Sequence, residues 1–274
     1  MRGQRQARAA RQRPCPPAGR RHGWYDVRNI HSSVYCQPLR LPKGLFHFFH
    51  MNRGGAHLLI ELHYLPGVAW FAVAAGFGRV VVEAREHYVK GSFRNRCHIA
   101  GSHGLQRLSV PLVRGKNAGM PIRRVRVAHQ QPWMRAHWHS IQSAYGRTPF
   151  FEHYAPRLEA HFQRPPEFLF DWNLALLHTL LDCLELELEI ETSRHWFPLG
   201  ETPDHLVDFR NRIHPKRPDP RLQTALQRHP YPQPFLERHG FLPGLSVLDL
   251  LFSQGPAAPL ILQAVWGSWQ EGGL

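Results

Sequence analysis

Three cationic side chains stand close together in a short polar stretch of this sequence. Lys90, Arg94 and Arg96 lie between two runs with the composition of β-strands, at residues 79–84 and 105–112. Ammonium and guanidinium groups bind phosphate and carboxylate, and the planar guanidinium can do so with two parallel hydrogen bonds. A polar loop at a strand end is positioned by the sheet. The spacing therefore predicts an anion-binding site, although a solvated charged loop has the same composition.

Acid–base chemistry has two candidate residues, His137 and Glu61. His137 shares one face of a predicted helix with Trp133 and Ile141, at i−4 and i+4. It is the candidate general base, and the alternative is a hydrogen-bonded structural histidine. Glu61 is the acidic residue of the first apolar run, and its carboxylate is suited either to orient a histidine or to pair with the arginines. The same two roles apply to two nearby acids, Glu83 and Glu86, with ion pairing favoured for at least two of the three.

No metal site and no cofactor are predicted. His137 and His139 point about 200° apart around a helix, so they cannot chelate one ion. The sequence has no HExxH, CxxC, Walker A, GxGxxG or GxSxG pattern. Its four cysteines show no regular spacing, so no disulfide framework is implied and a reducing cytoplasm fits best. Cys97 would suit thiol chemistry, but a buried inert thiol is the commoner role for a lone cysteine beside a strand.

The elements that must position these residues begin at position 57. Residues 57–62 form an apolar run of strand length, residues 68–76 a short helix, and residues 79–84 a second strand. Strand, helix and strand make a βαβ unit, the usual start of a parallel sheet. The loop at 62–66 then lies at the carboxyl end of the first strand, where open α/β sheets bind ligands. Further along, residues 97–112 predict a β-hairpin across a Gly-Ser-His-Gly turn.

The second half of the chain is mainly helical in pattern. The predicted helices, strands and loops are: a strand at 122–128, helices at 133–145, 150–163 and 167–184, a strand at 185–192, an irregular stretch at 198–234, a helix at 245–252 and an apolar tail at 260–266. Asp249 interrupts an apolar run, and a solvent-facing carboxylate is the expected outcome there. The fold class predicted is α/β: a small, mainly parallel Rossmann-like sheet with an added β-hairpin and a helical C-terminal half.

The charge of the chain is concentrated in its first segment. The formal net charge is +14, and residues 1–50 contribute +9 of it, with ten Lys or Arg against Asp26 alone. That segment is basic and rich in chain breakers, which is typical of disorder. A transit peptide is one alternative, and translation that begins at Met51 is the favoured one. We therefore expect a disordered leader at 1–50 and a single domain at 51–274. No run of 18 apolar residues is present, so no membrane insertion is expected.

Four ordered blocks of sequence resemble the WbqC-like family of bacterial proteins. The blocks are IELHYLPxxxWF at 60–71, EHYVKGSFRNRC at 86–97, QPWxxxHWxSIQSAYGxxPFFEHY at 131–154 and HGFLPGLSVLDLLFSQGP at 239–256. The resemblance implies a place in O-antigen and other surface-polysaccharide loci, with acyl or aminoacyl transfer to amino sugars. The family's Tyr-x-Lys and Asn-Arg patterns fall on Tyr88, Lys90, Asn95 and Arg96. They add Tyr88 and Asn95 to the predicted ligand-binding residues, which also include Tyr145.

This sequence departs from the family pattern at two of the candidate positions. Glu61 places an acid where the family's strand-end pattern has an amide, and Cys97 stands where distant members commonly have asparagine. The family also places a histidine at the position of His137, which supports the choice of base.

Two function hypotheses follow. The first is a cytoplasmic transferase that binds a nucleotide sugar or activated acyl donor through Lys90, Arg94 and Arg96, with His137 as base. The second is a non-catalytic protein that binds nucleic acid or another anionic ligand. Nucleic acid is the less favoured partner, because residues 51–274 carry only +5 of the net charge.

Overall fold

The computed structural model describes residues 55–113, 118–164 and 166–271. The leader predicted at 1–50 lies outside these residues. Four strands form one parallel sheet in the order β5 (Glu189–Thr192), β2 (Arg79–Glu83), β1 (His57–Glu61) and β6 (Leu206–Asp208). Leu58, Leu59 and Ile60 of β1 have no exposed surface, as expected for a central parallel strand covered on both faces.

The first two strands are joined by a buried helix, which confirms the predicted βαβ unit. Helix α1 (Val68–Phe77) begins after Gly67 and is buried along its whole length. It ends at Gly78, whose φ of +73° lies in the left-handed region that glycine adopts without strain. β1 and β2 then pair in register from Leu58–Val80 to Glu61–Glu83. The carboxyl ends of both strands therefore meet at one edge of the sheet.

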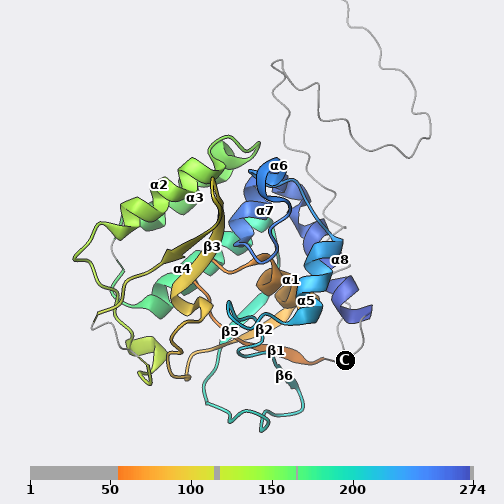
Figure 1. Cartoon of the computed structure of the whole chain (residues 1–274). Coiled ribbons are helices and arrows are strands. Elements are labelled where there is room, and N and C mark those ends of the chain that lie inside the picture. Colours follow the sequence, from red (N-terminus) through yellow and green to blue (C-terminus); the bar gives the residue numbers. More distant parts are fainter. Residues whose placement is uncertain (1–54, 114–117, 165, 272–274) are drawn as a thin grey trace, which may run out of the picture. The chain divides into compact units, whose positions relative to one another are not determined.

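The predicted β-hairpin is also confirmed. A single 3₁₀ turn, η3 (Phe93–Asn95), leads into β3 (Arg96–Gly101), which pairs with β4 (Gly104–Ser109). One face of the hairpin buries Cys97, Ile99 and Leu108. The hairpin packs against α2 (Trp133–Tyr145) and α7 (Val247–Gln254) (Figure 1).

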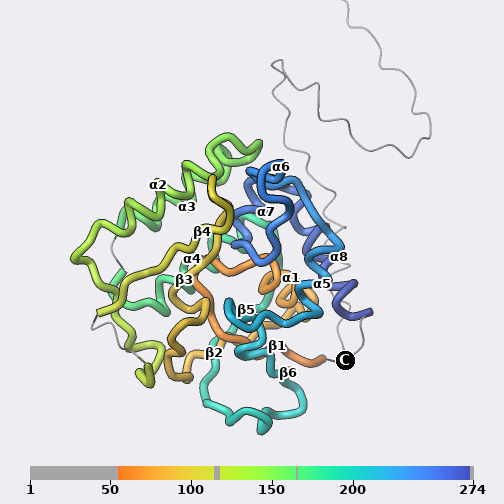
Figure 2. Tube along the Cα trace, in the orientation of Figure 1, coloured from red at the N-terminus to blue at the C-terminus, as the bar shows by residue number. Residues whose placement is uncertain are grey.

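Two sequence-based predictions of secondary structure were wrong, and a third was too long. Residues 122–128 form the turn η4 (Ile122–Arg124) and two isolated bridges, because their partners, Leu112 and Phe168, each offer a single pairing residue. The irregular stretch at 198–234 contains β6 and helix α5 (Pro220–Arg228), and Figure 2 shows β6 beside β1 from the opposite end of the sequence. The strand predicted at 185–192 is only β5, because Glu185 adopts a left-handed cap after α4 (Leu169–Leu184).

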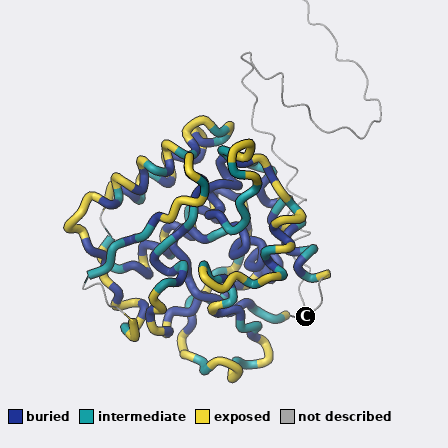
Figure 3. Tube along the Cα trace, viewed as in Figure 1, coloured by how far each residue is buried: buried dark blue, intermediate teal, exposed yellow. Residues whose placement is uncertain are grey.

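The remaining helices complete a continuous core. They are α3 (Phe151–Phe162), α6 (Leu236–His239), the turn η5 (Gly255–Ala257) and α8 (Ala258–Glu271). α8 packs against both α1 and α5. Figure 3 shows that the central strands and α1 are buried, while the loop between β5 and β6 and the outer side of α2 are exposed. Within the described residues, no helix is long and apolar enough to span a membrane.

The contact between α1 and α8 gives a test of this packing. A Cβ added at Gly76 would lie 2.1 Å from Cε2 of Trp266, on the facing helix. We expect Gly76→Ala to lower the free energy of unfolding by about 1–3 kcal/mol, because the indole must leave its position. Urea unfolding followed by Trp fluorescence measures this. Gly267→Ala, on α8 with open space around its Cβ, is the matched control and should be neutral or stabilise by about 0.5–1 kcal/mol. Equal effects of both changes would contradict the packing.

Candidate functional site

Three carboxylates end three adjacent parallel strands. Glu61 closes β1, Glu83 closes β2 and Asp208 closes β6, and the first two are almost completely buried. Arg210 lies between two of them. It donates to Asp208 at 2.9 and 2.6 Å and to Glu83 at 3.1 Å. The carboxyl edge of the sheet, predicted as the ligand side, is therefore held together by buried ion pairs.

Arg94 is the second cation of this buried network. Its guanidinium donates through Nε to Glu86 at 2.7 Å and through Nη2 to the same carboxylate, and it reaches Asn211 Oδ1 at 3.1 Å. Nη1 lies 4.0 Å from Glu61, and the side chain has no exposed surface. The network confirms the ion pairing expected of Glu61, Glu83 and Glu86. It also ties the predicted anion-binding arginine to protein carboxylates.

Arg94, Asn95 and Arg96 do not alternate between two faces as residues of a β-strand would. The turn η3 directs both Arg94 and Asn95 into the interior. Asn95 accepts from the Tyr88 hydroxyl at 2.8 Å and donates to the Val110 carbonyl at 2.9 Å. Tyr88, Arg94 and Asn95 thus connect the polar loop to the hairpin and the sheet.

Two of the predicted ligand-binding cations remain accessible. Lys90 is exposed in the polar loop, and Arg96 is half-buried at the start of β3. Within the described part of the chain, neither forms a salt bridge, and Nε of Arg96 has no hydrogen-bond partner. The sequence-predicted anion site therefore divides into a buried structural half and an open cationic half.

Glu61 holds a second histidine, His63, which the sequence reasoning did not single out. His63 Nε2 lies 3.1 Å from Glu61 Oε1, and the Asn211 backbone N–H donates to Glu61 Oε2 at 2.8 Å. Burial opposes ionisation of Glu61, but the contact with His63, the charge of Arg94 and the Asn211 N–H lower its pKa to about 2. An ionised Glu61 accepts a proton-bearing Nε2, which leaves the lone pair of His63 on Nδ1. Among the described residues that nitrogen has no partner.

His137 lies among aromatic rings and contacts Tyr64, the residue that follows His63 in the sequence. The Tyr64 hydroxyl contacts its Nδ1 at 3.0 Å, and the rings of Trp133 and Tyr64 pack beside it. Burial lowers the pKa of His137 to about 4, so the imidazole is neutral at pH 7. The structure places Glu61 on His63 rather than on His137.

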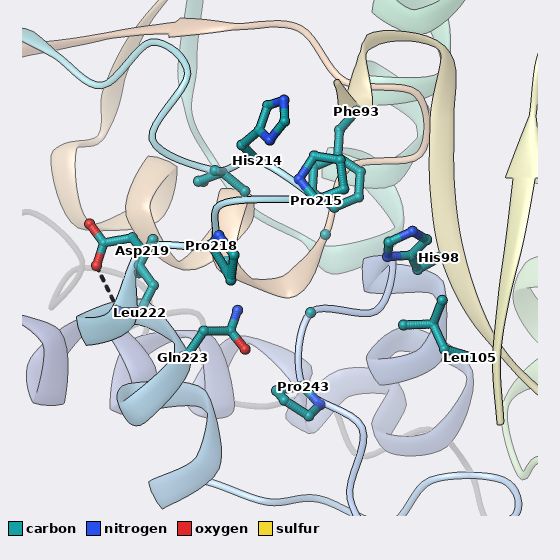
Figure 4. A pocket seen from close by; sticks show the side chains of 14 residues that line it. Phe93, His98, Leu105, His214, Pro215, Pro218, Asp219, Leu222, Gln223 and Pro243 are labelled. Atoms are coloured by element: carbon teal, nitrogen blue, oxygen red, sulfur yellow. Dashed lines mark hydrogen bonds between the residues drawn. The ribbon is translucent and has the colours of Figure 1, made fainter. Parts of the chain in front are cut away.

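A pocket lies between the start of α1, the hairpin and the segment that follows β6. Its volume is about 160 Å³, and Figure 4 shows His98 and Leu105 projecting into it from the hairpin, opposite Pro218 and Gln223. A narrow recess shares four lining residues with this pocket, and His63 and Cys97 belong to its wall. The four shared residues are Gly67, Phe93, His98 and Gly244. This pocket and recess, at the carboxyl end of β1, form the candidate site.

Most residues that line the pocket come from segments without a clear local pattern in the sequence. His63 follows Glu61 by two residues at a strand end, and that spacing was a usable signal. Gln223 and His214 come from the stretch that was predicted to be irregular, and only the pairing of β6 with β1 brings that stretch to the site. Cys97 is buried as expected, and burial raises the pKa of its thiol. No group of three or more His, Cys, Asp or Glu in the described residues is arranged to hold a metal ion.

Tyr145 and Asp249 belong to a separate buried cluster beneath the hairpin. The Tyr145 hydroxyl accepts from the Ala100 backbone N–H at 3.0 Å, and Tyr145 does not line the pocket. The solvent-facing position expected for Asp249 was wrong, since it has no exposed surface. Burial raises the pKa of Asp249 to about 7, against the lowering effect of nearby Tyr231, Tyr145 and Gln233. Among the described residues neither of its oxygens has a hydrogen bond of normal geometry.

Comparison with known proteins identifies the family. The family model of the WbqC-like protein family matches residues 62–217, and the chain belongs to this family. A curated relative is "Uncharacterized protein Rv1507c" from Mycobacterium tuberculosis (strain ATCC 25618 / H37Rv). It is 21% identical over an alignment of 227 residues, and the alignment covers 73% of this chain and 94% of the relative. No solved structure matches. The matched segment begins directly after Glu61. It contains His63, the polar loop, the hairpin and β6.

The two arginines of the polar loop should respond differently to substitution. Arg94→Ala leaves Glu86 buried without its partner, so we expect a loss of about 3–5 kcal/mol in the free energy of unfolding. Arg96→Ala should cost about 1 kcal/mol or less, because its half-buried side chain forms no ion pair in the described structure. Urea titrations at pH 7 measure the free energy of unfolding of both variants. An Arg94→Ala protein as stable as the wild type would show that the Arg94–Glu86 ion pair is not needed to stabilise the polar loop.

Asp249 should make stability depend on pH in a defined direction. Its pKa in the folded state, about 7, lies above the ordinary value of 3.8, so between these values the folded protein binds more protons than the unfolded chain. Stability should therefore fall as pH rises from about 4 to about 7, by an amount on the order of a few kcal/mol. Asp249→Asn should flatten this part of the profile. Parallel urea titrations at several pH values measure the two slopes, and identical slopes would contradict the assignment.

Proposed function

We propose that this WbqC-like protein is a transferase of bacterial surface-polysaccharide assembly. It would move an acyl or aminoacyl group from an activated donor to the amine of an amino sugar or nucleotide sugar. The observation that carries the proposal is the Glu61–His63 pair. A buried carboxylate holds one imidazole nitrogen of His63, the other nitrogen is buried without a hydrogen-bond partner among the described residues, and His63 belongs to the wall of the recess. A carboxylate that orients a histidine is the usual arrangement of a general base.

The chemistry of the transfer follows from that geometry. His63 Nδ1 removes a proton from the attacking amine, a bond forms between nitrogen and the acyl carbon, and the bond from that carbon to the leaving group breaks. The protonated His63 then returns the proton to the leaving group. Glu61 stays ionised throughout and stabilises the imidazolium by charge. This role differs from that of His137, which we retain as the second candidate base because Tyr64 connects the recess to it.

Anionic substrates suit the charge around the site. Lys90 and Arg96 supply cations that no described carboxylate neutralises, while Arg94, Tyr88 and Asn95 hold the loop that carries them. The free thiols Cys97 and Cys183 suit a reducing compartment, which supports a cytoplasmic location for the proposed reaction. The competing function is non-catalytic binding of an anionic ligand, which the same cations would serve.

A substrate panel combined with site variants tests the proposal. Nucleotide-linked amino sugars are incubated with acyl-coenzyme A, acyl-phosphate or aminoacyl-adenylate donors, and the mass gain of the sugar is followed. We expect one donor class to give product, and His63→Gln to lower kcat by about 10²- to 10⁴-fold with little change in binding. The matched control is His153→Gln, an exposed histidine on α3.

Each other outcome changes the assignment. Loss of turnover in His137→Gln together with full activity in His63→Gln would move the base to His137. Binding of the nucleotide sugar without product from any donor would favour the non-catalytic function.

A further inference from the structure

One face of the β3–β4 hairpin carries three basic groups and no acid. The register pairs His98 with Arg107 and Arg96 with Ser109, so Arg96, His98 and Arg107 lie on the same side of the two strands. The other residues of this face are Ala100, Leu105 and Ser109. The opposite side of the hairpin packs into the core through Cys97 and Ile99.

The three basic groups repel one another. Burial lowers the pKa of Arg96, and the charge of Arg107 lowers it further. The pKa of His98 is lowered in the same way. Burial is the largest cause, and the charges of Arg96 and Arg107 lower the pKa further. Within the described residues neither arginine has a salt bridge, and Nε of Arg96 is enclosed without a partner. Positively charged side chains that are held close together without a protein carboxylate can bind an anionic ligand.

The cationic face continues into the candidate pocket. His98 and Leu105 form part of the pocket wall, and Figure 4 shows them beside Phe93 and Pro243. Prolines and the Phe93 ring supply apolar surface, and His214, Asp219 and Gln223 are the other polar residues of the wall. The carboxylate of Asp219 is paired with Arg212. A ligand in this position would meet guanidinium groups at one end and apolar surface at the other.

We propose that Arg96, His98 and Arg107 bind a phosphate group of the ligand while its remainder occupies the adjoining pocket, and that binding brings a proton onto His98. The inference rests on the proposed function only for the location of the substrate, and it concerns binding alone. Two guanidinium groups and an imidazolium match the two charges and several acceptor oxygens of a phosphate dianion better than the single charge of a carboxylate. A pocket of about 160 Å³ also selects a small group such as a sugar ring over a nucleic-acid duplex.

Calorimetric titration at pH 7 with glucosamine 1-phosphate tests this site directly. Glucosamine 6-carboxylate (glucosaminuronate) serves as the carboxylate comparison. We expect Arg96→Gln and Arg107→Gln each to raise the Kd for the phosphate about tenfold or more, since each removes a charge-assisted contact. Arg135→Gln, which removes an exposed arginine from α2 outside the pocket, is the matched control and should leave Kd unchanged.

Proton uptake on binding tests the role of His98 separately, because attraction of the ligand by the arginines alone would not add a proton to the protein. Repeating the titration in buffers of different ionisation enthalpy counts the protons bound with the ligand. Wild type should take up a fraction of a proton at pH 7 beyond the uptake due to the ligand's own ionisation, and His98→Gln should lose that fraction. Unchanged affinity in both arginine variants, equal weakening in Arg135→Gln, or tighter binding of the carboxylate would overturn the proposal.

The same titration separates this inference from the catalytic one. His63→Gln should bind glucosamine 1-phosphate like wild type. If the phosphate binds in the predicted way and no donor yields product, the phosphate site stands and the transferase proposal fails.

Discussion

Three carboxylates at the ends of neighbouring parallel strands are the constraint on which this structure depends. Glu61, Glu83 and Asp208 would repel one another at the carboxyl edge of the sheet, and water does not screen the two that are buried. Arg210 and Arg94 neutralise them from two different loops. Each guanidinium is held by several hydrogen bonds, which is the condition under which a buried ion pair is tolerated.

The same ion pairs bring distant segments together around the pocket. Arg94 carries the polar loop that precedes the hairpin, and Arg210 and Asn211 follow β6. Because both attach to the carboxyl ends of β1 and β2, the hairpin and the residues after β6 are fixed on opposite sides of the pocket. The pocket is therefore a consequence of how the buried charge is balanced. Its walls come from segments more than a hundred residues apart.

Charge balance inside the protein also separates structural from accessible cations. Arg94 and Arg210 are committed to carboxylates, whereas Arg96 and Arg107 have none within the described structure. An ionised Glu61 in turn fixes the proton of His63 on one nitrogen and leaves the other nitrogen without a hydrogen-bond partner among the described residues. His98 lines both the pocket and the recess, and His63 lines the recess, so the basic face of the hairpin and the Glu61–His63 pair are connected through the wall of one site.

The sequence by itself determined the local pattern of the fold and the location of the polar loop. Apolar runs of strand length, glycines after α1 and the hairpin turn are signals carried by neighbouring residues, so the βαβ unit, the hairpin and the helices α2, α3 and α4 could be predicted. Four ordered motifs likewise pointed to the WbqC-like family. The tertiary structure alone decided which charges are buried, because the turn η3 directs Arg94 and Asn95 into the interior while Arg96 stays half-buried.

Tertiary pairing also decided which histidine meets Glu61 and which segments line the pocket. β6 has only three residues, too short for a periodic signal, yet its pairing with β1 places residues 211–223 at the site. Asp249 is buried for a similar reason, since helices packed around α7 leave no side of it open to solvent. Burial and long-range pairing depend on contacts between residues far apart in the chain, and local composition does not encode them.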